Sequence, residues 1–413
     1  MRFRLANAAT YPSGLNLPWS KPLAHWPEEH FVDVARGISR NLVRFVEHDG
    51  SVYALKELLE HVATREYRLL RSLTELDLPV VEPVGLVTER DPVPMESGTQ
   101  EQMALLVTRF LPHALPFRTV ISGGVSVAQA HNLLDALAEL LVELHLAGFF
   151  WGDVSLSNAL FRRDAGRYSA YLVDAETGEL RARLSDGQRA HDLTIAEENV
   201  AGEFLDLKAG YGLSEGLDPV DAAARLVRQY DDLWSELTRE DVFGAHEQYL
   251  IDRRIQRLNA LGFDVEELDV QTIEGGHKIR MRAKIVEPGH HRRLLQALTG
   301  LDVEENQART LLNDLYRFRA WHAGQASHPM ADEVAAYRWL NEVYRPTLDS
   351  IPPELRRRLD DAEIFHQILE HRWYMSERSG RDMPLDTVVP SYVEQVLAKL
   401  PEPAIAEPPL PTE

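Results

Sequence analysis

The sequence predicts an α+β protein: a small antiparallel β lobe, then a helical lobe, then a mostly helical carboxy-terminal domain containing a β-hairpin. Three observations lead to this prediction. Apolar residues alternate with a period of two in short segments of residues 1–112, which is typical of strands. From residue 126 onward they recur mainly at helical spacing. A second pair of alternating segments interrupts the helices at residues 263–287.

The β lobe is expected at residues 28–112, after an irregular lead-in at residues 1–27 that is rich in proline. Five strands are predicted, at residues 30–37, 41–48, 52–58, 81–89 and 103–111. Asp49-Gly50 supplies the residue types of a tight hairpin turn between the second and third strands. A helix is expected at residues 62–76, and the Pro/Gly/Ser-rich segment 91–100 is expected to be a mobile loop.

The helical lobe is expected at residues 113–250. Its strongest helix is predicted at residues 126–147, with Gly148 as the carboxy-terminal stop. The join to the next domain, at residues 235–262, reads as continuous helix without a Pro/Gly-rich linker. A flexible tether would have such a linker, so we expect the next domain to pack rigidly against the helical lobe.

The carboxy-terminal domain is expected at residues 251–400, followed by a proline-rich, disordered tail at residues 401–413. The second strand of its hairpin places four cations on one face: Lys278, Arg280, Arg282 and Lys284. We favour pairing of these cations with acidic residues of the partner strand (Asp264, Glu266, Glu267 and Asp269). The alternative is a site for an anionic substrate or a nucleic acid.

Aromatic residues recur at helical spacing in the carboxy-terminal domain, and we expect most of them to lie in helix–helix cores and in contacts with the first half of the chain. They are Tyr316, Phe318, Trp321, Tyr337, Trp339, Tyr344, Phe365, Trp373 and Tyr374. The alternative is an aromatic cage for a ligand.

The composition of the chain excludes several classes of site and of partner. The chain has 413 residues, a net charge of -21 and no cysteine, which excludes disulfides, thiolate nucleophiles and cysteine-based metal sites. A chain this acidic repels nucleic acid and anionic membrane over most of its surface, so a nucleic-acid partner is not expected. No apolar run is long enough to span a membrane and no secretory signal is evident, so a cytoplasmic location is expected.

Four separated pieces of the first half together suggest phosphoryl transfer. Lys56 lies in the predicted strand VYALKEL, and Glu66 follows ten residues later on a predicted helix. Asp153 and Asn158 stand five apart in a loop of small polar residues, and Asp174 ends the strand YLVD. Phosphoryl transfer needs a cation for the phosphates, an acid to hold it, a carboxylate for the acceptor hydroxyl and oxygen ligands for Mg²⁺.

On these motifs, residues 28–235 resemble the bilobal protein-kinase-like superfamily. WGDVSLSNALF and REYRLLRSLTELDLPVVEPVGLV are similar to segments of the bacterial lipopolysaccharide (Kdo/WaaP-type) kinases. His191-Asp192-Leu193 resembles the Asp-Leu pair of aminoglycoside-phosphotransferase relatives. The chain also resembles bacterial proteins that join such a half to a carboxy-terminal domain of unknown function.

The resemblance implies a role for each residue. Lys56 would hold ATP phosphates, Glu66 would pair with Lys56, and Asp153 would orient or deprotonate the acceptor hydroxyl. Asn158 and Asp174 would hold Mg²⁺. The other nucleotide-binding residues would come from the phosphate-covering loop and the adenine-binding hinge: Gly37, Ser39, Asn41, Thr108 and Phe110.

Three departures from the kinase pattern bear on activity. The loop that would cover the nucleotide, residues 35–41, has a single glycine. Trp151-Gly152 stands where His would precede the catalytic aspartate, and Asp174-Ala175-Glu176 replaces D-F-G. Glu176 is either a further carboxylate near the metal or an exposed turn residue, and we favour the turn.

The sequence therefore predicts an ATP- and Mg²⁺-dependent kinase. An A-P-E anchor is missing from residues 180–215, which favours a hydroxyl of a small molecule, sugar or glycolipid over a protein as acceptor. The alternative function is a pseudokinase-like nucleotide-binding scaffold or regulatory protein whose carboxy-terminal domain binds a partner. Neither the acceptor's identity nor the oligomeric state can be predicted from the sequence.

Overall fold

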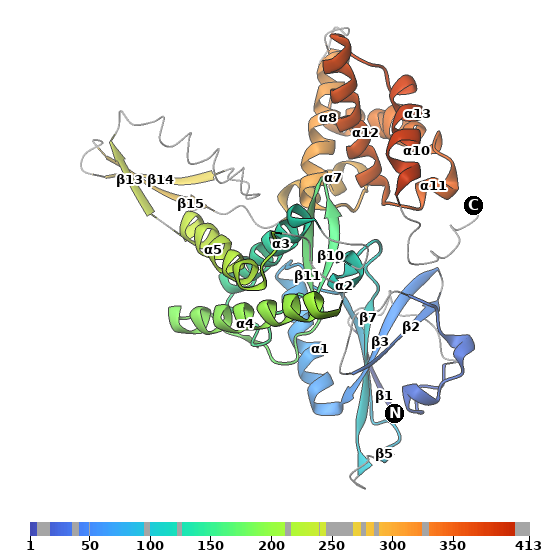
Figure 1. Ribbon diagram of the computed structural model, residues 1–413, viewed down its shortest axis with the longest axis vertical. Helices are drawn as coiled ribbons and strands as arrows, with labels where there is room; N and C mark the ends of the chain where they lie inside the picture. The colour runs from blue at the N-terminus through green and yellow to red at the C-terminus, as the bar shows by residue number, and fades with distance from the viewer. Residues whose placement is uncertain are drawn as a thin grey trace. The chain divides into compact units, whose positions relative to one another are not determined.

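The structure is a computed structural model, and its described residues form two compact units (Figure 1). It describes residues 1–5, 17–34, 41–48, 50–94, 100–121, 126–210, 216–238, 240–244, 267–273, 278–284, 289–323 and 330–400. The first unit contains the described residues up to 162 and from 169 to 232. The second contains residues 163–168 and the described residues from 233 to 400. The predicted tail at residues 401–413 lies outside the described residues.

The amino-terminal lobe is built on a five-stranded antiparallel sheet, which confirms the predicted β lobe. Its strands, in spatial order, are β1 (Arg2–Leu5), β4 (Pro83–Thr88), β7 (Met103–Arg109), β3 (Ser51–Leu59) and β2 (Leu42–His48). Gly50, between β2 and β3, has a φ of +72°, as a tight turn requires. Two short strands at the ends of the segment expected to be a loop, β5 (Val93–Pro94) and β6 (Gln100–Glu101), pair with each other.

The membership of this sheet differs from the prediction at two places. Of the strand predicted at residues 30–37, residues 35–37 lie outside the described residues and residues 31–34 are not a strand. A short 3-10 helix (Glu28–His30) precedes them, and Phe31 stacks on Trp26 with ring centroids 6.2 Å apart. The fifth strand is β1, inside the lead-in that was expected to be irregular. Its Phe3 packs edge-on against Trp19 at 5.7 Å. Tertiary packing of the lead-in against the sheet therefore decides which segment becomes the edge strand.

One helix, α1 (Glu60–Glu75), packs on the sheet and confirms the helix expected at residues 62–76. Its buried stripe recurs at helical spacing and consists of Ala63, Glu66, Tyr67, Leu70 and Leu73. Glu66 is the one acid in this otherwise largely apolar stripe, so the fold turns that carboxylate inward.

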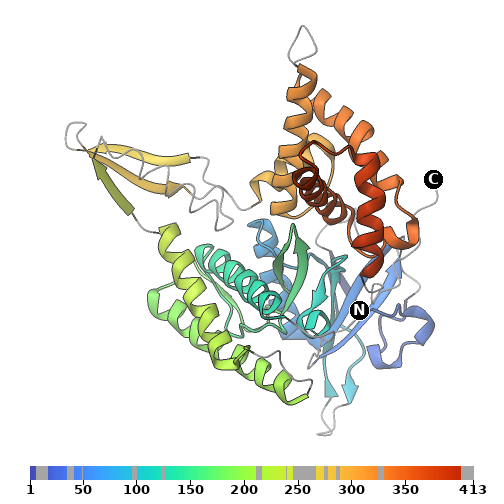
Figure 2. The ribbon, with the colours of Figure 1, turned by 45° about the horizontal axis from the view of Figure 1, so that its top comes forward.

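The rest of the first unit is mainly helical (Figure 2). Its helices are α2 (Phe117–Ile121), α3 (Val127–Leu146), α4 (Asp186–Gly210) and α5 (Pro219–Thr238), the last of which runs across the boundary between the units. Helix α3 begins at a capping box of Ser126 and Gln129 and ends before Gly148, whose φ is +86°. A Cβ at Gly148 would lie 2.1 Å from the Arg181 carbonyl oxygen, so glycine is required there. The predicted helix and its stop are confirmed.

Two small sheets frame the loop that follows α3. The first has the order β11 (Arg167–Leu172), β10 (Ala159–Asp164) and β8 (Leu115–Pro116). The second pairs β9 (Phe149–Phe150) with β12 (Glu179–Leu180). The segment 151–158 therefore lies between β9 and β10, and Asp174 follows β11.

The second unit is mostly helical, as predicted, around a core of its own. Its helices are α7 (His290–Thr299), α8 (Glu305–Ala323), α9 (Asp332–Trp339), α10 (Arg345–Asp349), α11 (Pro353–Arg356), α12 (Asp361–Ser379) and α13 (Leu385–Gln395). Trp339, Tyr344 and Phe365 pack together in the core. Four aromatics expected in helix–helix cores are instead exposed, namely Trp321, Tyr337, Trp373 and Tyr374. Tyr337 and Trp339 are two positions apart on α9, so one helix turns them to different sides.

The hairpin of the second unit forms as predicted and gains a third strand. β14 (Glu267–Ile273) pairs with β15 (Lys278–Lys284), and its register sets Glu267 opposite Lys284 and Asp269 opposite Arg282. β13 (Glu240–Gly244) pairs with the other edge of β15. The continuous helix predicted across residues 235–262 is therefore wrong, because pairing with β15 makes residues 240–244 a strand. Asp264 and Glu266 lie outside the described residues.

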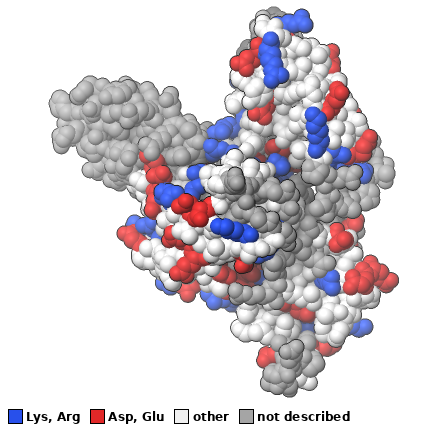
Figure 3. Space-filling model, viewed as in Figure 1, with Lys and Arg blue, Asp and Glu red and all other residues white. Residues whose placement is uncertain are grey.

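In the part of the chain that the structure describes, no helix combines the length and apolar character needed to cross a membrane. Asp and Glu side chains are interspersed with Lys and Arg on the face shown in Figure 3.

Candidate functional site

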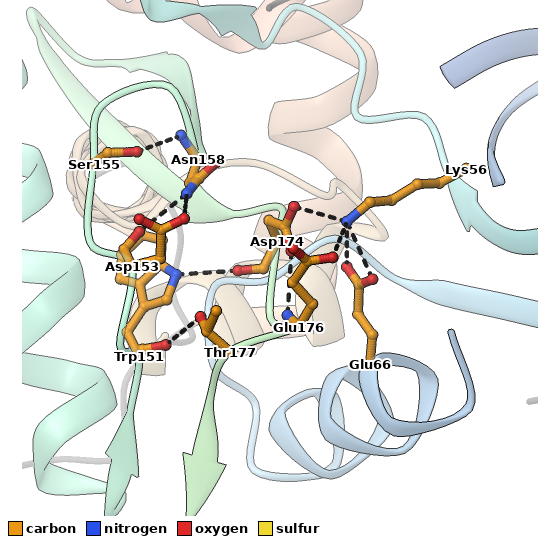
Figure 4. Close-up of polar contacts among 9 residues, drawn as sticks. All are labelled: Lys56, Glu66, Trp151, Asp153, Ser155, Asn158, Asp174, Glu176 and Thr177. Carbon is orange, nitrogen blue, oxygen red and sulfur yellow. Dashed lines mark hydrogen bonds and ion pairs between the residues drawn. The ribbon is translucent and has the colours of Figure 1, made fainter. Parts of the chain in front are cut away.

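The centre of the site is the ammonium group of Lys56, which meets carboxylates from two directions (Figure 4). The Nζ atom of Lys56, on β3, lies 3.0 and 3.1 Å from the two carboxylate oxygens of Glu66 on α1. It lies 2.7 Å from Oδ2 of Asp174. Oε2 of Glu176 is 3.9 Å away. The structure thus brings together Lys56, Glu66 and Asp174, which lie far apart in the sequence.

Burial and neighbouring charges shift the pKa values of Lys56 and Glu66 in opposite directions. Burial alone would lower the pKa of Lys56, but the carboxylates of Glu66 and Asp174 outweigh it and raise this pKa above its ordinary value. The Glu66 side chain is fully buried, and its desolvation raises the pKa of Glu66 to about 7 although Lys56 opposes the shift. Lys56 therefore stays a cation, while Glu66 titrates near neutrality.

The residues around Lys56 fit a divalent metal ion. Glu66, Asp174 and Glu176 each offer a carboxylate oxygen, and these atoms lie within 4.8 Å of one another. Carboxylate oxygens are the ligands that Mg²⁺ prefers. Glu176 lies in a turn, as we favoured, but it is only about one-third exposed and its carboxylate faces Lys56.

The loop between β9 and β10 holds Asp153 and Asn158 against each other. Nδ2 of Asn158 donates to Oδ2 and to the backbone carbonyl of Asp153, both at 3.0 Å. The backbone N–H of Asn158 donates to Oγ of Ser155 at 3.2 Å. With its amide nitrogen on Asp153, Asn158 keeps its side-chain oxygen as the atom that a metal ion would use.

Helix α4 supports this loop with three side chains. Asp192 was expected only as part of the His191-Asp192-Leu193 motif, and Asn199 and Glu203 were not predicted as site residues. Asp192 accepts the backbone N–H groups of Trp151 and Gly152, at 2.7 and 2.8 Å. Asn199 donates to Oδ1 of Asp153 at 3.2 Å. Glu203 accepts the N–H groups of Leu156 and Ser157, at 2.9 and 2.8 Å. Their spacing could have identified them from the sequence. Asn199 and Glu203 lie seven and eleven positions after Asp192, which puts all three on one face of the helix.

Buried Asp192 is itself oriented by a histidine. Nε2 of His145 lies 3.1 Å from Asp192, and Nδ1 lies 2.7 Å from the Tyr230 hydroxyl. Burial lowers the pKa of His145, so the ring is neutral at pH 7. A neutral ring satisfies both contacts if Nε2 donates to Asp192 and Nδ1 accepts from Tyr230.

The contacts and the backbone conformation of Trp151 and Gly152 explain why these two residues precede Asp153. The buried indole of Trp151 donates to the Asp174 carbonyl at 3.0 Å, and the Trp151 carbonyl accepts the Thr177 hydroxyl at 2.8 Å. These bonds tie the loop to the segment that carries Asp174. Gly152 has a φ of +78°, and a Cβ there would meet the ring of Phe150 at 3.1 Å.

Of the five other predicted nucleotide-binding residues, the structure describes three. Gly37 and Ser39 lie outside the described residues, and Asn41 directly precedes β2. Thr108 lies in β7, where it pairs with Ala54 of β3. The N–H of Phe110 donates to the Val52 carbonyl at 3.0 Å, so that donor is already engaged.

Comparison with known proteins gives a separate result for each half. Residues 45–201 match the lipopolysaccharide kinase (Kdo/WaaP) family, and residues 232–397 match a domain of unknown function (DUF4032). None of the curated proteins matches the chain.

Two solved structures are similar to parts of the chain. WaaP in complex with acyl carrier protein is 16% identical, with a TM-score of 0.36, over 63% of this chain and 99% of that one. The yeast RNA Pol II CTD kinase CTDK-1 complex is 19% identical, with a TM-score of 0.24, over 38% of this chain and 50% of that one.

The family match agrees with the antiparallel sheet, the Lys56–Glu66 pair and the loop of Asp153 and Asn158, and it supports a kinase-like phosphotransferase. The chain therefore carries a segment that is similar to the lipopolysaccharide kinase (Kdo/WaaP) family, followed by a segment that matches a domain of unknown function (DUF4032).

Proposed function

We propose that the first unit transfers a phosphoryl group from Mg²⁺-bound ATP to a hydroxyl of a small molecule, sugar or glycolipid. The observation that carries the proposal is the position of Lys56, bonded to both Glu66 and Asp174. A buried helix acid that orients a strand lysine, together with an aspartate at a strand end, is the arrangement that phosphoryl transfer requires.

Lys56 binds phosphate oxygens of the nucleotide. Its ammonium stays charged because two carboxylates face it. Glu66 holds the ammonium in place from α1 and does not contact the nucleotide. Nucleotide phosphates then replace part of the carboxylate surroundings of Lys56, and the electrostatic attraction holds the phosphates in position.

Asp153 accepts the proton of the acceptor hydroxyl or orients that hydroxyl for attack. Its two oxygens receive hydrogen bonds from Asn158 and Asn199, which fix the direction of the carboxylate. Such orientation matters because a general base must lie within hydrogen-bond reach of the proton that it removes.

Mg²⁺ would be held by Asp174 and Asn158, with Glu176 as a further carboxylate, and it would neutralise charge on the transferred phosphoryl group. Gly37, Ser39 and Asn41 are proposed to cover the phosphates. Thr108 and Phe110 are proposed to line the adenine site. Because the Phe110 N–H already donates to Val52, the adenine contact there falls to other backbone atoms of this segment.

A small or glycolipid acceptor is favoured by the short connection after Asp174. Only residues 175–185 separate it from α4, and two of them form β12. The family description, a lipopolysaccharide kinase, also favours a glycolipid hydroxyl.

Calorimetric titration with ATP, with and without Mg²⁺, tests the proposal. Wild type is expected to bind ATP more tightly with Mg²⁺, and Lys56→Ala is expected to lose most of that affinity. Lys208→Ala, which removes an exposed cation on α4, is the matched control. Absence of binding at millimolar ATP, or equal binding by Lys56→Ala, contradicts the proposal.

A further inference from the structure

The hairpin of β10 and β11 joins the candidate site to a distant turn. Asn158 directly precedes β10, and Asp174 lies two residues after the end of β11. The backbone N–H of Val173 donates to the Asn158 carbonyl at 3.1 Å, which fastens the two strand ends together. Asn158 and Asp174, the two main proposed metal ligands, are therefore carried by the base of one hairpin.

The tip of this hairpin is a two-residue turn at Ala165-Gly166. Both residues have positive φ, +52° and +81°, which is the geometry of a type I′ turn. Glycine adopts this conformation readily, whereas alanine does so at a cost. Surrounding contacts must therefore hold Ala165 in place.

The contacts of the tip come from the second unit, to which residues 163–168 belong. Asp164 is 1% exposed, and its Oδ1 accepts the N–H of Gln307 at 2.8 Å. Its Oδ2 accepts Nδ2 and the backbone N–H of Asn306, at 2.8 and 3.3 Å. These N–H groups belong to the first turn of α8, so Asp164 caps that helix from a separate segment of the chain.

A second set of hydrogen bonds fixes the tip backbone. Nε2 of Gln307 donates to the Arg163 carbonyl and to Oε2 of Glu363, both at 3.1 Å. The same Glu363 oxygen accepts the Ala165 N–H at 3.0 Å. Glu363 lies on α12 and is 1% exposed. Helices α8 and α12 thus hold both the side chain and the backbone of the turn.

We propose that Asp164, Asn306, Gln307 and Glu363 are positioning residues for the metal-binding end of the kinase-like site. The second unit holds the hairpin tip, and the paired strands carry this constraint to Asn158 and Asp174 at the base. This inference rests on the proposed function, because it takes Asn158 and Asp174 as metal ligands. According to this inference, the domain of unknown function sets the geometry of the metal ligands in the first unit. Through that geometry it also sets the Mg²⁺ affinity of the first unit.

The test compares Asp164→Asn and Asn306→Ala with Asp314→Asn in the full chain. In Asp164→Asn, either orientation of the new side-chain amide would turn its NH₂ group toward an N–H donor of α8. Asn306→Ala removes one donor with less disturbance. Asp314 is the matched control, because it is also an acid that accepts a hydrogen bond within the second unit, from Nε1 of Trp339 at 2.9 Å.

The first readout needs no nucleotide. Hydrogen exchange of the Val173 amide, relative to amides of α3, is expected to rise about tenfold in Asp164→Asn, less in Asn306→Ala and not in the control. The second readout is the Mg²⁺ concentration for half-maximal ATP binding, which is expected to rise about tenfold in Asp164→Asn, as for other residues that orient metal ligands.

Unchanged exchange at Val173, together with faster exchange at Ala165, would overturn the inference whether or not ATP binds. An equal rise in the control would also overturn it, since the effect would then be general loosening of the second unit. Should wild type bind no ATP while Val173 responds as expected, the proposed function fails and the mechanical coupling stands.

Discussion

The loop of Asp153 and the cluster around Lys56 are both rich in carboxylates, but they differ in how these are satisfied. In the loop, Asp153 accepts side-chain amides, and Asp192 and Glu203 accept backbone N–H groups. In the cluster, three carboxylates share the single ammonium of Lys56. Uncharged donors satisfy the loop, whereas the cluster has more negative than positive charge.

The loop and the cluster therefore differ in how they are prepared to bind a ligand. The loop is preorganised by hydrogen bonds within the protein, so its geometry does not need a ligand. The cluster gains stability when a divalent cation enters, because the cation offsets the repulsion among the carboxylates. Mutations in the loop should therefore affect turnover and folding, and mutations in the cluster should affect metal affinity and the response to pH.

The largest effect is expected from Asp153→Asn. The amide cannot accept the proton of the acceptor hydroxyl, so ATP turnover should fall by about 10²- to 10⁴-fold while ATP affinity stays the same. Background ATP hydrolysis measures turnover where the acceptor is unknown, and calorimetry measures affinity. Asp186→Asn, an exposed acid at the start of α4, is the control. Equal turnover of Asp153→Asn and wild type would favour a nucleotide-binding scaffold.

The cluster makes the pH dependence of stability informative. The pKa of Glu66 is raised from 4.5 to about 7 by burial, so the folded state binds more protons than the unfolded state between these values. Stability of wild type relative to Glu66→Gln should then fall as pH rises through this window, by up to roughly 3 kcal/mol, and level off above it.

Thermal or urea unfolding from pH 4 to pH 8 measures this difference. Wild-type stability that rises with pH relative to Glu66→Gln would mean that pairing with Lys56 outweighs the desolvation of Glu66. In that case the carboxylates of the cluster are satisfied as well as those of the loop, and the two regions do not differ in this respect.

The next prediction tests how much helix α4 stabilises the loop of Asp153. Asp192→Asn keeps the shape of the side chain but turns an NH₂ group toward N–H donors, so unfolding free energy should fall by about 2–3 kcal/mol. Urea unfolding measures the loss. Asp206→Asn, on an exposed part of the same helix, is the control. A loss no larger than the control's would show that the loop holds its geometry without α4.

The parts of the site that are marked by local order and spacing could be predicted from the sequence. Lys56, Glu66, Asp153, Asn158 and Asp174 stand out because each lies at a telling place on a predicted strand, helix or loop, and the structure brings Lys56, Glu66 and Asp174 into contact. The α+β class and the long helix before Gly148 followed from periodicity.

Other features depend on contacts that no local pattern encodes. Asn199 and Glu203 look like ordinary polar residues of a helix until the loop packs against them. The edge strand β1 forms because the lead-in returns to the sheet, and β13 forms because β15 offers a free edge. Asp164 stands next to a two-residue turn, yet its partners lie 142 and 143 positions away, at Asn306 and Gln307.

The smallest effect is expected from Glu176→Gln, and it tests whether the cluster extends beyond Asp174. Glu176 approaches Lys56 to 3.9 Å and offers an oxygen near those of Glu66 and Asp174, so it adds negative charge where Mg²⁺ would bind. Removing that charge should weaken Mg²⁺ affinity by about tenfold, with turnover at saturating Mg²⁺ nearly unchanged. Calorimetric Mg²⁺ titration in the presence of ATP gives the affinity, and Glu179→Gln, an exposed acid three residues on, is the control. If Glu176→Gln and Glu179→Gln bind Mg²⁺ equally well, the metal is held by Asp174 and Asn158 alone. The third carboxylate would then serve only to hold Lys56 before the nucleotide arrives.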